Sequence, residues 1–168
     1  MTTTMTGENT VDTSLNGRTA LITGASKGLG LAMAKAFYTH GAKVVLLARG
    51  AADLATAETE IQALTVADAH RDSADVATFV CDVTDAKAIA ATHQRAVDRF
   101  GAIDILVNNA GQSAAKPFLS ITDEEWQADL DLKLMAAVRM TRLVWPGMAE
   151  RQRGRIINLL NVFAKLPD

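Results

Sequence analysis

Thr19-Ala-Leu-Ile-Thr-Gly-Ala-Ser-Lys-Gly-Leu-Gly30 is the stretch that decides the fold, because an apolar run breaks into glycines and then continues with helical spacing. The run from Ala20 to Ile22 suits a short strand that is buried on both faces. The residues that follow recur at the three-and-four spacing of one helix face: Leu29, Ala32, Met33, Ala36 and Phe37. We therefore predict a strand, a glycine-rich turn and a helix.

The turn contains Gly24, Gly28 and Gly30. Glycine allows positive φ angles and lets a phosphate approach backbone N–H groups, and the N-terminus of the following helix adds partial positive charge. The pyrophosphate of a dinucleotide suits such a turn. The alternative is an ordinary connection between a strand and a helix, because a glycine-rich turn alone is a weak signal.

Four further strands are expected to follow along the chain: Lys43 to Ala48, Val76 to Val80, Ile103 to Val107, and Arg155 to Leu160. The segments between them predict helices over Ala51 to Leu64, from a Thr84 cap to Gly101, and from a capping box at Thr122 to Glu125 towards Pro146. This alternation predicts an α/β fold with a doubly wound parallel sheet of the Rossmann type. We expect residues 1–16 to be a flexible tail and residues 17–168 to be one dinucleotide-binding domain.

Several polar or glycine-rich segments directly follow the predicted strands. They are Gly24 to Gly30, Arg49, Asp82 with Val83, and Asn109 to Gly111. In doubly wound sheets ligands bind at the carboxyl ends of the strands. The sequence therefore predicts one crevice to which all these segments contribute.

Composition excludes several classes of function. The 168 residues carry 17 basic and 19 acidic side chains, so we expect neither nucleic acid nor an anionic membrane as a partner. Cys81 is the single cysteine and the histidines His40, His70 and His93 are scattered, so we expect no metal site. We find no signal peptide pattern and no apolar run of 18 residues, and we expect a cytoplasmic protein.

The long helix carries two apolar stripes on roughly opposite sides. One stripe contains Leu130, Leu134, Ala137, Val138 and Trp145. The other contains Leu132, Met135, Ala136, Met140 and Leu143. The sheet can cover only one stripe, so we expect a homo-oligomer through residues 123–148, with the second stripe as the contact.

Two motifs resemble the short-chain dehydrogenase/reductase family: Thr-Gly-x-x-x-Gly-x-Gly at Thr23 to Gly30, and Asn-Asn-Ala-Gly at Asn108 to Gly111. The general Gly-x-Gly-x-x-Gly pattern is not met, because Met33 stands where its last glycine is needed. The resemblance runs from about Leu15 to the end of the sequence and covers roughly the first two-thirds of a typical family domain, so we expect the C-terminal part of that domain to be absent. It implies an NAD(P)-dependent oxidoreductase acting on a carbonyl or alcohol.

The resemblance also implies the cofactor-binding positions, with Asp82 and Val83 near the adenine and Asn109 near a ribose. The full set is Thr23, Gly24, Ser26, Lys27, Gly28, Leu29, Gly30, Arg49, Asp82, Val83, Asn109, Ala110 and Gly111. Arg49 stands where NAD enzymes place an acid for the ribose 2′-hydroxyl, and Lys27 is a second cation in the turn, so we predict NADP(H) rather than NAD(H). The alternative is that both are solvated surface charges.

The catalytic positions depart from the family. Its serine aligns with Asn161 and its helix asparagine with Lys133, whereas its Tyr-x-x-x-Lys motif would start past Asp168. The single tyrosine, Tyr38, is predicted to be a packing or surface residue. Two hypotheses stay open: the cofactor-binding part of an NADP(H)-dependent oxidoreductase whose own turnover is low without the tyrosine acid, and a non-catalytic nucleotide-binding or interaction protein.

Overall fold

A computed structural model describes residues 13–64, 75–113 and 116–160 and shows five strands in one sheet. The strands are β1 (Thr19–Thr23), β2 (Lys43–Ala48), β3 (Val76–Val80), β4 (Ile105–Asn108) and β5 (Arg155–Asn158). Their order is β3-β2-β1-β4-β5 and every neighbouring pair is parallel. The predicted doubly wound sheet is confirmed.

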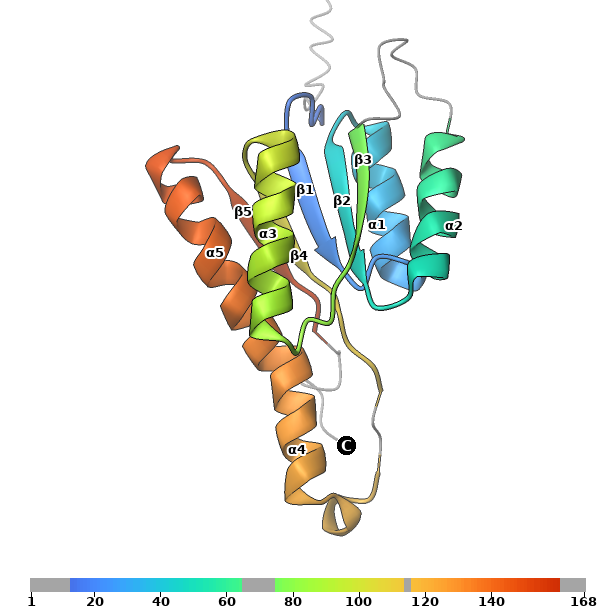
Figure 1. The fold of residues 1–168 in the computed structure, drawn as a ribbon, viewed down its shortest axis with the longest axis vertical. Helices are drawn as coiled ribbons and strands as arrows, with labels where there is room; N and C mark the ends of the chain where they lie inside the picture. The colour runs from blue at the N-terminus through green and yellow to red at the C-terminus, as the bar shows by residue number, and fades with distance from the viewer. Residues whose placement is uncertain (1–12, 65–74, 114–115, 161–168) are drawn as a thin grey trace, which may run out of the picture.

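Helices cover both faces of this sheet (Figure 1). The helices α1 (Gly28–Thr39) and α2 (Ala51–Gln62) lie on one face, and α3 (Ala86–Phe100) and α5 (Ala136–Glu150) on the other. One apolar core lies between the sheet and each pair of helices. Tyr38 and Ile61 belong to the core under α1 and α2, and Ile89 and Met140 to the core under α3 and α5. Burial from both sides explains why the central strands read as unbroken apolar runs. The packing position of Tyr38 agrees with its prediction.

Several strand boundaries differ from the prediction by one or two residues. β4 begins at Ile105 rather than Ile103, and β5 ends at Asn158 rather than Leu160. Asp104 lies just before β4, where its carboxylate accepts from the backbone N–H of Thr19 at 3.1 Å. At the other end Asn108 pairs with Asn158 as the last residue of both strands, so the ladder stops there.

The helix after β3 is capped by Asp85, and the predicted Thr84 cap is wrong. Asp85 Oδ1 accepts from the backbone N–H of Lys87 at 2.8 Å. The Thr84 hydroxyl instead donates to Asp82 Oδ1 at 2.8 Å. A threonine and an aspartate are both good caps, and the sequence alone did not decide between them.

The predicted apolar face of α1 is only in part the one that packs on the sheet. Met33 and Phe37 pack against the core, whereas Leu29 is 70% exposed. The buried residues of the helix are Gly30, Ala34 and Tyr38. Gly30 packs directly against the turn after β1, where any side chain at this position would collide with Gly24. This contact determines how the helix is rotated about its axis. Just before β1, Leu15 packs on the core of this face and its N–H donates to the carbonyl of His40, so the folded unit includes Leu15.

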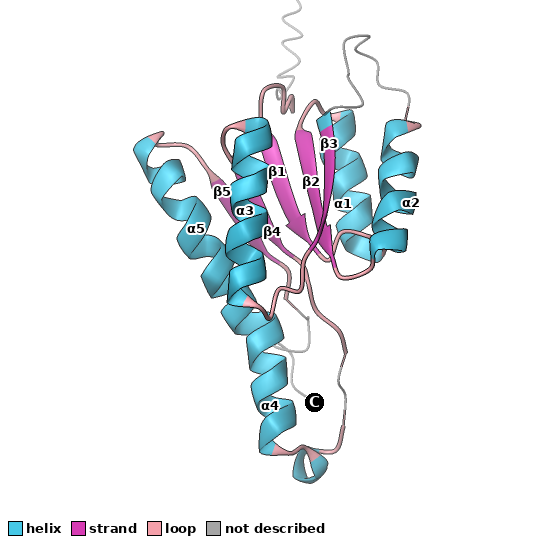
Figure 2. Cartoon of the chain, viewed as in Figure 1, coloured by secondary structure: helices cyan, strands magenta, loops and turns pink. Residues whose placement is uncertain are grey.

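The long helix is continuous but irregular. α4 (Asp123–Leu130) begins with the predicted Thr122–Glu125 capping box and passes through a π-helical turn, η3 (Asp131–Met135), into α5. The helix continues to Glu150, beyond Pro146. α4 and the short 3₁₀ turn η2 (Phe118–Ser120) extend past the carboxyl ends of the strands (Figure 2).

Of the two stripes on this helix, the structure buries the one that we expected to contact a partner. Ala136 and Met140 pack into the core between the sheet and α3. Leu130, Leu134 and Trp145 are 44%, 53% and 61% exposed. The choice of the second stripe as a contact surface is therefore wrong, because periodicity identifies two stripes without saying which one faces the sheet. No helix within the described ranges is long and apolar enough to span a membrane.

Candidate functional site

A cleft of about 1330 Å³ opens at the carboxyl ends of the strands. All four predicted segments contribute to its lining, from the glycine turn to the loop after β4. The predicted cofactor-binding residues that line it are Thr23, Gly24, Ser26, Lys27, Leu29, Arg49, Asp82, Val83, Asn109, Ala110 and Gly111. Gly28 and Gly30 lie in the first turn of α1 and do not line the cleft.

Two glycines allow the turn to pack tightly. Gly24 has a φ of +64°, and a Cβ there would lie 3.0 Å from the Cα of Ala110. A Cβ on Gly30 would lie 2.4 Å from the carbonyl oxygen of Gly24 and 2.6 Å from Asn109 Nδ2. The first turn of α1 therefore lies directly against the ends of β1 and β4, and any larger residue at Gly30 would force them apart.

Thr23 joins the two sequence motifs. Its buried hydroxyl accepts from the backbone N–H groups of Asn109 at 3.0 Å and Ala110 at 2.9 Å. In return, Asn109 Nδ2 donates to the carbonyls of Thr23 at 2.9 Å and Gly24 at 3.1 Å. The glycine turn and the Asn-Asn-Ala-Gly loop are thus one hydrogen-bonded unit, which the separate motifs did not reveal.

The start of α1 is suited to an anion. Its N-cap residue is Lys27, and no described side chain caps the first turn. The N-terminal N–H groups of a helix lack intrahelical acceptors and carry partial positive charge, so they bind phosphates well. Gly28, with a φ of +57°, has nothing within 4 Å of where its Cβ would be. The backbone donors, the space and the nearby lysine fit the pyrophosphate of a dinucleotide.

Charged residues of both signs lie beside this turn. Lys27 and Arg49 are exposed and line the cleft, and their side chains make no hydrogen bond or ion pair with another described residue. Asp82 also lines it, and its pKa is lowered, first by the backbone N–H of Thr84, then by the Thr84 hydroxyl and more weakly by Arg49. Asp53, which sequence reasoning missed, adds a second carboxylate from the first turn of α2. Its position three residues after the Gly50 cap is the available sequence signal.

Lys133 lies at the opposite wall of the cleft, inside the π-helical turn. Its Nζ pairs with Asp129 Oδ1 at 2.6 Å, so the charge of the ammonium group is already balanced. Asn161, the other predicted catalytic position, lies outside the described residues. The structure therefore brings Lys133 to the cleft with the cofactor-binding residues, and it does not place Asn161.

The ends of β4 and β5 add an amide pair that we did not predict. Asn108 Nδ2 donates to Asn158 Oδ1 at 2.8 Å, and both residues line the cleft. Each is the last residue of its strand and directly follows apolar residues, which is the signal that could have identified them. Within the described residues, no three His, Cys, Asp or Glu side chains gather in a way that could hold a metal ion.

Residues 18–167 match the family model described as short chain dehydrogenase. The chain belongs to this family, so the resemblance of its two motifs is confirmed. Members of the family are oxidoreductases, and the sheet order and the cleft agree with that membership.

The relatives give the extent of the match. A protein of Streptomyces virginiae, named as a ketoacyl reductase of the monensin polyketide synthase, is 41% identical over 150 residues, which are 88% of this chain and 54% of that protein. A D-β-hydroxybutyrate dehydrogenase of Cupriavidus necator is 38% identical over 145 residues, 86% of this chain and 53% of that protein. The chain therefore spans about half the length of these relatives.

Solved structures agree with the fold. The structure of L-sorbose reductase from Gluconobacter frateurii, complexed with NADPH and L-sorbose, superposes with a TM-score of 0.84 at 35% identity. The match covers 94% of this chain and 57% of that one. The fold is thus shared with a reductase whose structure contains NADPH.

Proposed function

We propose that this chain binds NADP(H) in the cleft and forms the cofactor-binding part of an oxidoreductase that acts on a carbonyl or alcohol. The observation that carries the proposal is the pair of cations, Lys27 and Arg49, whose side chains make no hydrogen bond or ion pair with another described residue and line the cleft beside the uncapped first turn of α1. The NADPH complex of the L-sorbose reductase and the ketoacyl reductase name of the Streptomyces relative support the cofactor and the substrate class.

Each wall of the cleft has its own part in this proposal. The N–H groups at the start of α1 bind the pyrophosphate, and Arg49 and Lys27 donate to the 2′-phosphate. Asp82 and Val83 border the adenine, and Asn109 to Gly111 border the ribose on the nicotinamide side. When bound, the nicotinamide supplies or accepts a hydride. Lys133 and Asn161 would orient the substrate, Lys133 in place of the family's asparagine and Asn161 in place of its serine.

Calorimetric titration with NADPH and NADH tests the cofactor preference. A charge-assisted hydrogen bond contributes roughly 1.5–3 kcal/mol, so Arg49→Ala should weaken NADPH binding about tenfold or more and leave NADH almost unchanged. Asp53→Asn should strengthen NADPH binding, because it removes a negative charge from the wall of the cleft that we propose binds the 2′-phosphate. Lys35→Ala is the control, since Lys35 pairs with Glu60 on α2 and does not line the cleft. Equal affinities for the two cofactors in the unmutated chain would refute the proposal.

A second function, nucleotide binding without catalysis, is favoured by the ion pair between Lys133 and Asp129. A lysine held by a neighbouring carboxylate does not reproduce an asparagine in the same place. Measuring NADPH oxidation with ketones and aldehydes separates the two functions in the longest chain that the coding sequence provides. Turnover that depends on added carbonyl supports the enzyme, and tight NADPH binding without turnover supports the binding protein.

We also propose that the chain self-associates through the exposed stripe of the long helix, formed by Leu130, Leu134 and Trp145. Large apolar side chains rarely gather on the surface of a monomer without a contact to make. Phe118 and Trp126 extend this surface, with their rings 6.4 Å apart in an edge-to-face arrangement.

A further inference from the structure

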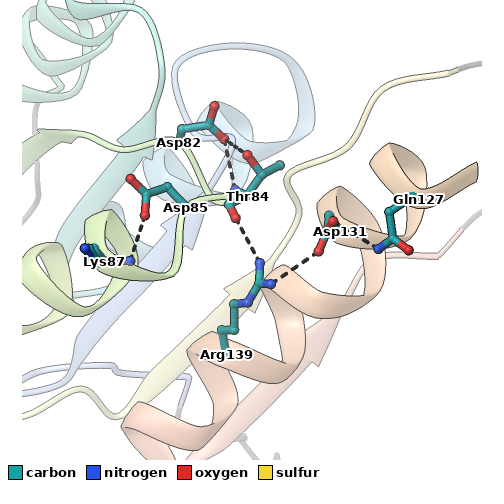
Figure 3. A network of polar contacts seen from close by, with 7 residues as sticks. All are labelled: Asp82, Thr84, Asp85, Lys87, Gln127, Asp131 and Arg139. Atoms are coloured by element: carbon teal, nitrogen blue, oxygen red, sulfur yellow. Dashed lines mark hydrogen bonds and ion pairs between the residues drawn. The ribbon is translucent and has the colours of Figure 1, made fainter. Parts of the chain in front are cut away.

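Arg139 connects two walls of the cleft that lie far apart in the sequence (Figure 3). Its Nη1 donates to the backbone carbonyl of Thr84 at 2.9 Å, and its Nη2 donates to Asp131 Oδ1 at 3.2 Å. Gln127 Nε2 donates to the other oxygen of Asp131 at 3.1 Å. One guanidinium group therefore joins the loop after β3 to α4 and the π-helical turn.

The loop end of this connection is held firmly. Asp82 Oδ1 accepts from both the backbone N–H and the hydroxyl of Thr84, at 2.9 and 2.8 Å. Asp82 and Val83 line the cleft, so the residues that face a bound ligand are tied to the carbonyl that Arg139 contacts. A ligand that fixes Asp82 and Val83 also fixes this carbonyl.

At the other end of the connection, the contact between Arg139 and Asp131 depends on the π-helical turn. Asp131 and Arg139 are eight residues apart. A regular α-helix has 3.6 residues per turn, so residues at this spacing point about 80° apart around its axis. The π-helical turn takes up an additional residue and brings the two side chains onto nearly the same side. The Asp131–Arg139 pair therefore stabilises the π-helical turn, and this turn presents Leu132, Lys133 and Leu134 to the cleft.

We propose that Arg139 is a positioning residue that couples occupancy of the adenine end of the cleft to the stability of the π-helical turn. The inference rests on the proposed binding of NADP(H), and it adds a connection between the cofactor-binding wall and the wall that carries Lys133. A ligand bound at Asp82 and Val83 restricts the motion of Thr84, which hydrogen-bonds to Asp82. The Thr84 carbonyl in turn fixes the guanidinium group of Arg139, and that group pairs with Asp131 in the π-helical turn. Cofactor binding thereby stabilises the π-helical turn that contains Lys133.

Hydrogen exchange followed by mass spectrometry tests the coupling. The probe is adenosine 2′,5′-bisphosphate, which has the adenine and the 2′-phosphate but no nicotinamide to touch the helix. Couplings between sites typically change equilibria 5- to 150-fold, so exchange in residues 127–138 should slow by about fivefold or more when the probe binds. Residues 141–150 lie beyond Arg139 and should change by less than about twofold.

Variants identify Arg139 as the cause. Arg139→Met should abolish the protection of residues 127–138 while the probe still protects residues 24–31, and Arg139→Lys should restore part of it. Asp131→Asn, a smaller change that keeps the shape of the side chain, should also reduce it. Lys35→Met removes an ion pair on the opposite face and should leave it intact.

The outcomes separate the two proposals. Protection of residues 24–31 with no slowing at residues 127–138, or full slowing that persists in Arg139→Met, would overturn the coupling alone. A probe that binds nowhere, together with NADPH that fails to bind in calorimetry, would overturn the proposed function and the coupling with it.

Discussion

Replacing Thr23 by valine removes the hydroxyl that joins the glycine turn to the Asn-Asn-Ala-Gly loop. Valine has nearly the same shape, so the side chain leaves no cavity and only its hydrogen bonds are lost. The backbone N–H groups of Asn109 and Ala110 would both lose their acceptor, and the 3.4 Å bond from the hydroxyl to the carbonyl of Val107 would be lost too. We expect the domain to lose stability and the cleft to lose its shape.

The magnitude follows from the number of orphaned donors. An unsatisfied buried donor costs roughly 1–3 kcal/mol. Because both bonds are only partly buried, water can reach the donors in part, and the lower end applies to each. We therefore expect Thr23→Val to reduce the free energy of unfolding by about 2 kcal/mol. Domains are stable by only about 5–15 kcal/mol, so this is a substantial fraction.

Urea denaturation measures the effect, and Thr19 provides a matched control. Thr19 lies on the same strand and is 3% exposed, but its hydroxyl makes no hydrogen bond with another described residue. With a urea dependence of about 1–3 kcal/mol per molar, Thr23→Val should lower the midpoint by about 1 M, whereas Thr19→Val should hardly change it. A difference of less than about 0.5 kcal/mol between the two variants would show that the N–H groups of Asn109 and Ala110 do not need the Thr23 hydroxyl for the stability of the domain.

Three further predictions concern other parts of the molecule. Burial raises the pKa of the Cys81 thiol, so a thiol reagent at pH 8 should label it slowly in the folded chain and quickly in urea. Charged substitutions in the exposed stripe, Leu134→Asp or Trp145→Asp, should shift a self-associating chain towards monomer in sedimentation velocity, and Met140→Asp should unfold it instead because Met140 is buried. The pKa of Asp82 is lowered from 3.8 chiefly by hydrogen bonds from Thr84. The ionised carboxylate therefore stabilises the folded chain fully above the pKa of the unfolded state, and this stabilisation is lost as the pH falls through the lower pKa of the folded state. Asp82→Asn should remove that acid-induced loss of stability when unfolding is measured between pH 5 and 2.

The order of strands and helices could be predicted because it depends on local patterns. Unbroken apolar runs such as Lys43 to Ala48 belong to strands covered on both faces, and the glycines at Gly41 and Gly101 end helices with positive φ angles. The choice of buried stripe on the long helix depends on which side meets α3, and no local pattern contains that contact. The rotation of α1, which leaves Leu29 exposed, likewise follows from a tertiary contact, the packing of Gly30 against Gly24.

The candidate site was predictable as a set of strand ends, since parallel strands bring their carboxyl ends to one edge. The residues that organise its walls were harder to find. Arg139 lies on a helix with no glycine or proline near the π-helical turn, and the turn that aligns it with Asp131 has no signature in the pattern of apolar residues. Asp53 was missed because its carboxylate reaches the cleft from a helix rather than from a strand end.

The residues of the site differ in how much the fold alone explains them. Thr23, Gly30 and Asn109 hold β1, α1 and β4 together, so a domain of this fold would retain them even without a ligand. The side chains of Lys27 and Arg49 make no hydrogen bond or ion pair within the described part of the chain, and the one interaction seen for their charges is the weak attraction of Arg49 for Asp82. Exposed substitutions of this kind usually change stability by less than about 0.5 kcal/mol. Arg49→Ala should therefore weaken NADPH binding at unchanged stability, whereas a loss of both together would show that Arg49 supports the fold and does not by itself determine a preference for a 2′-phosphate.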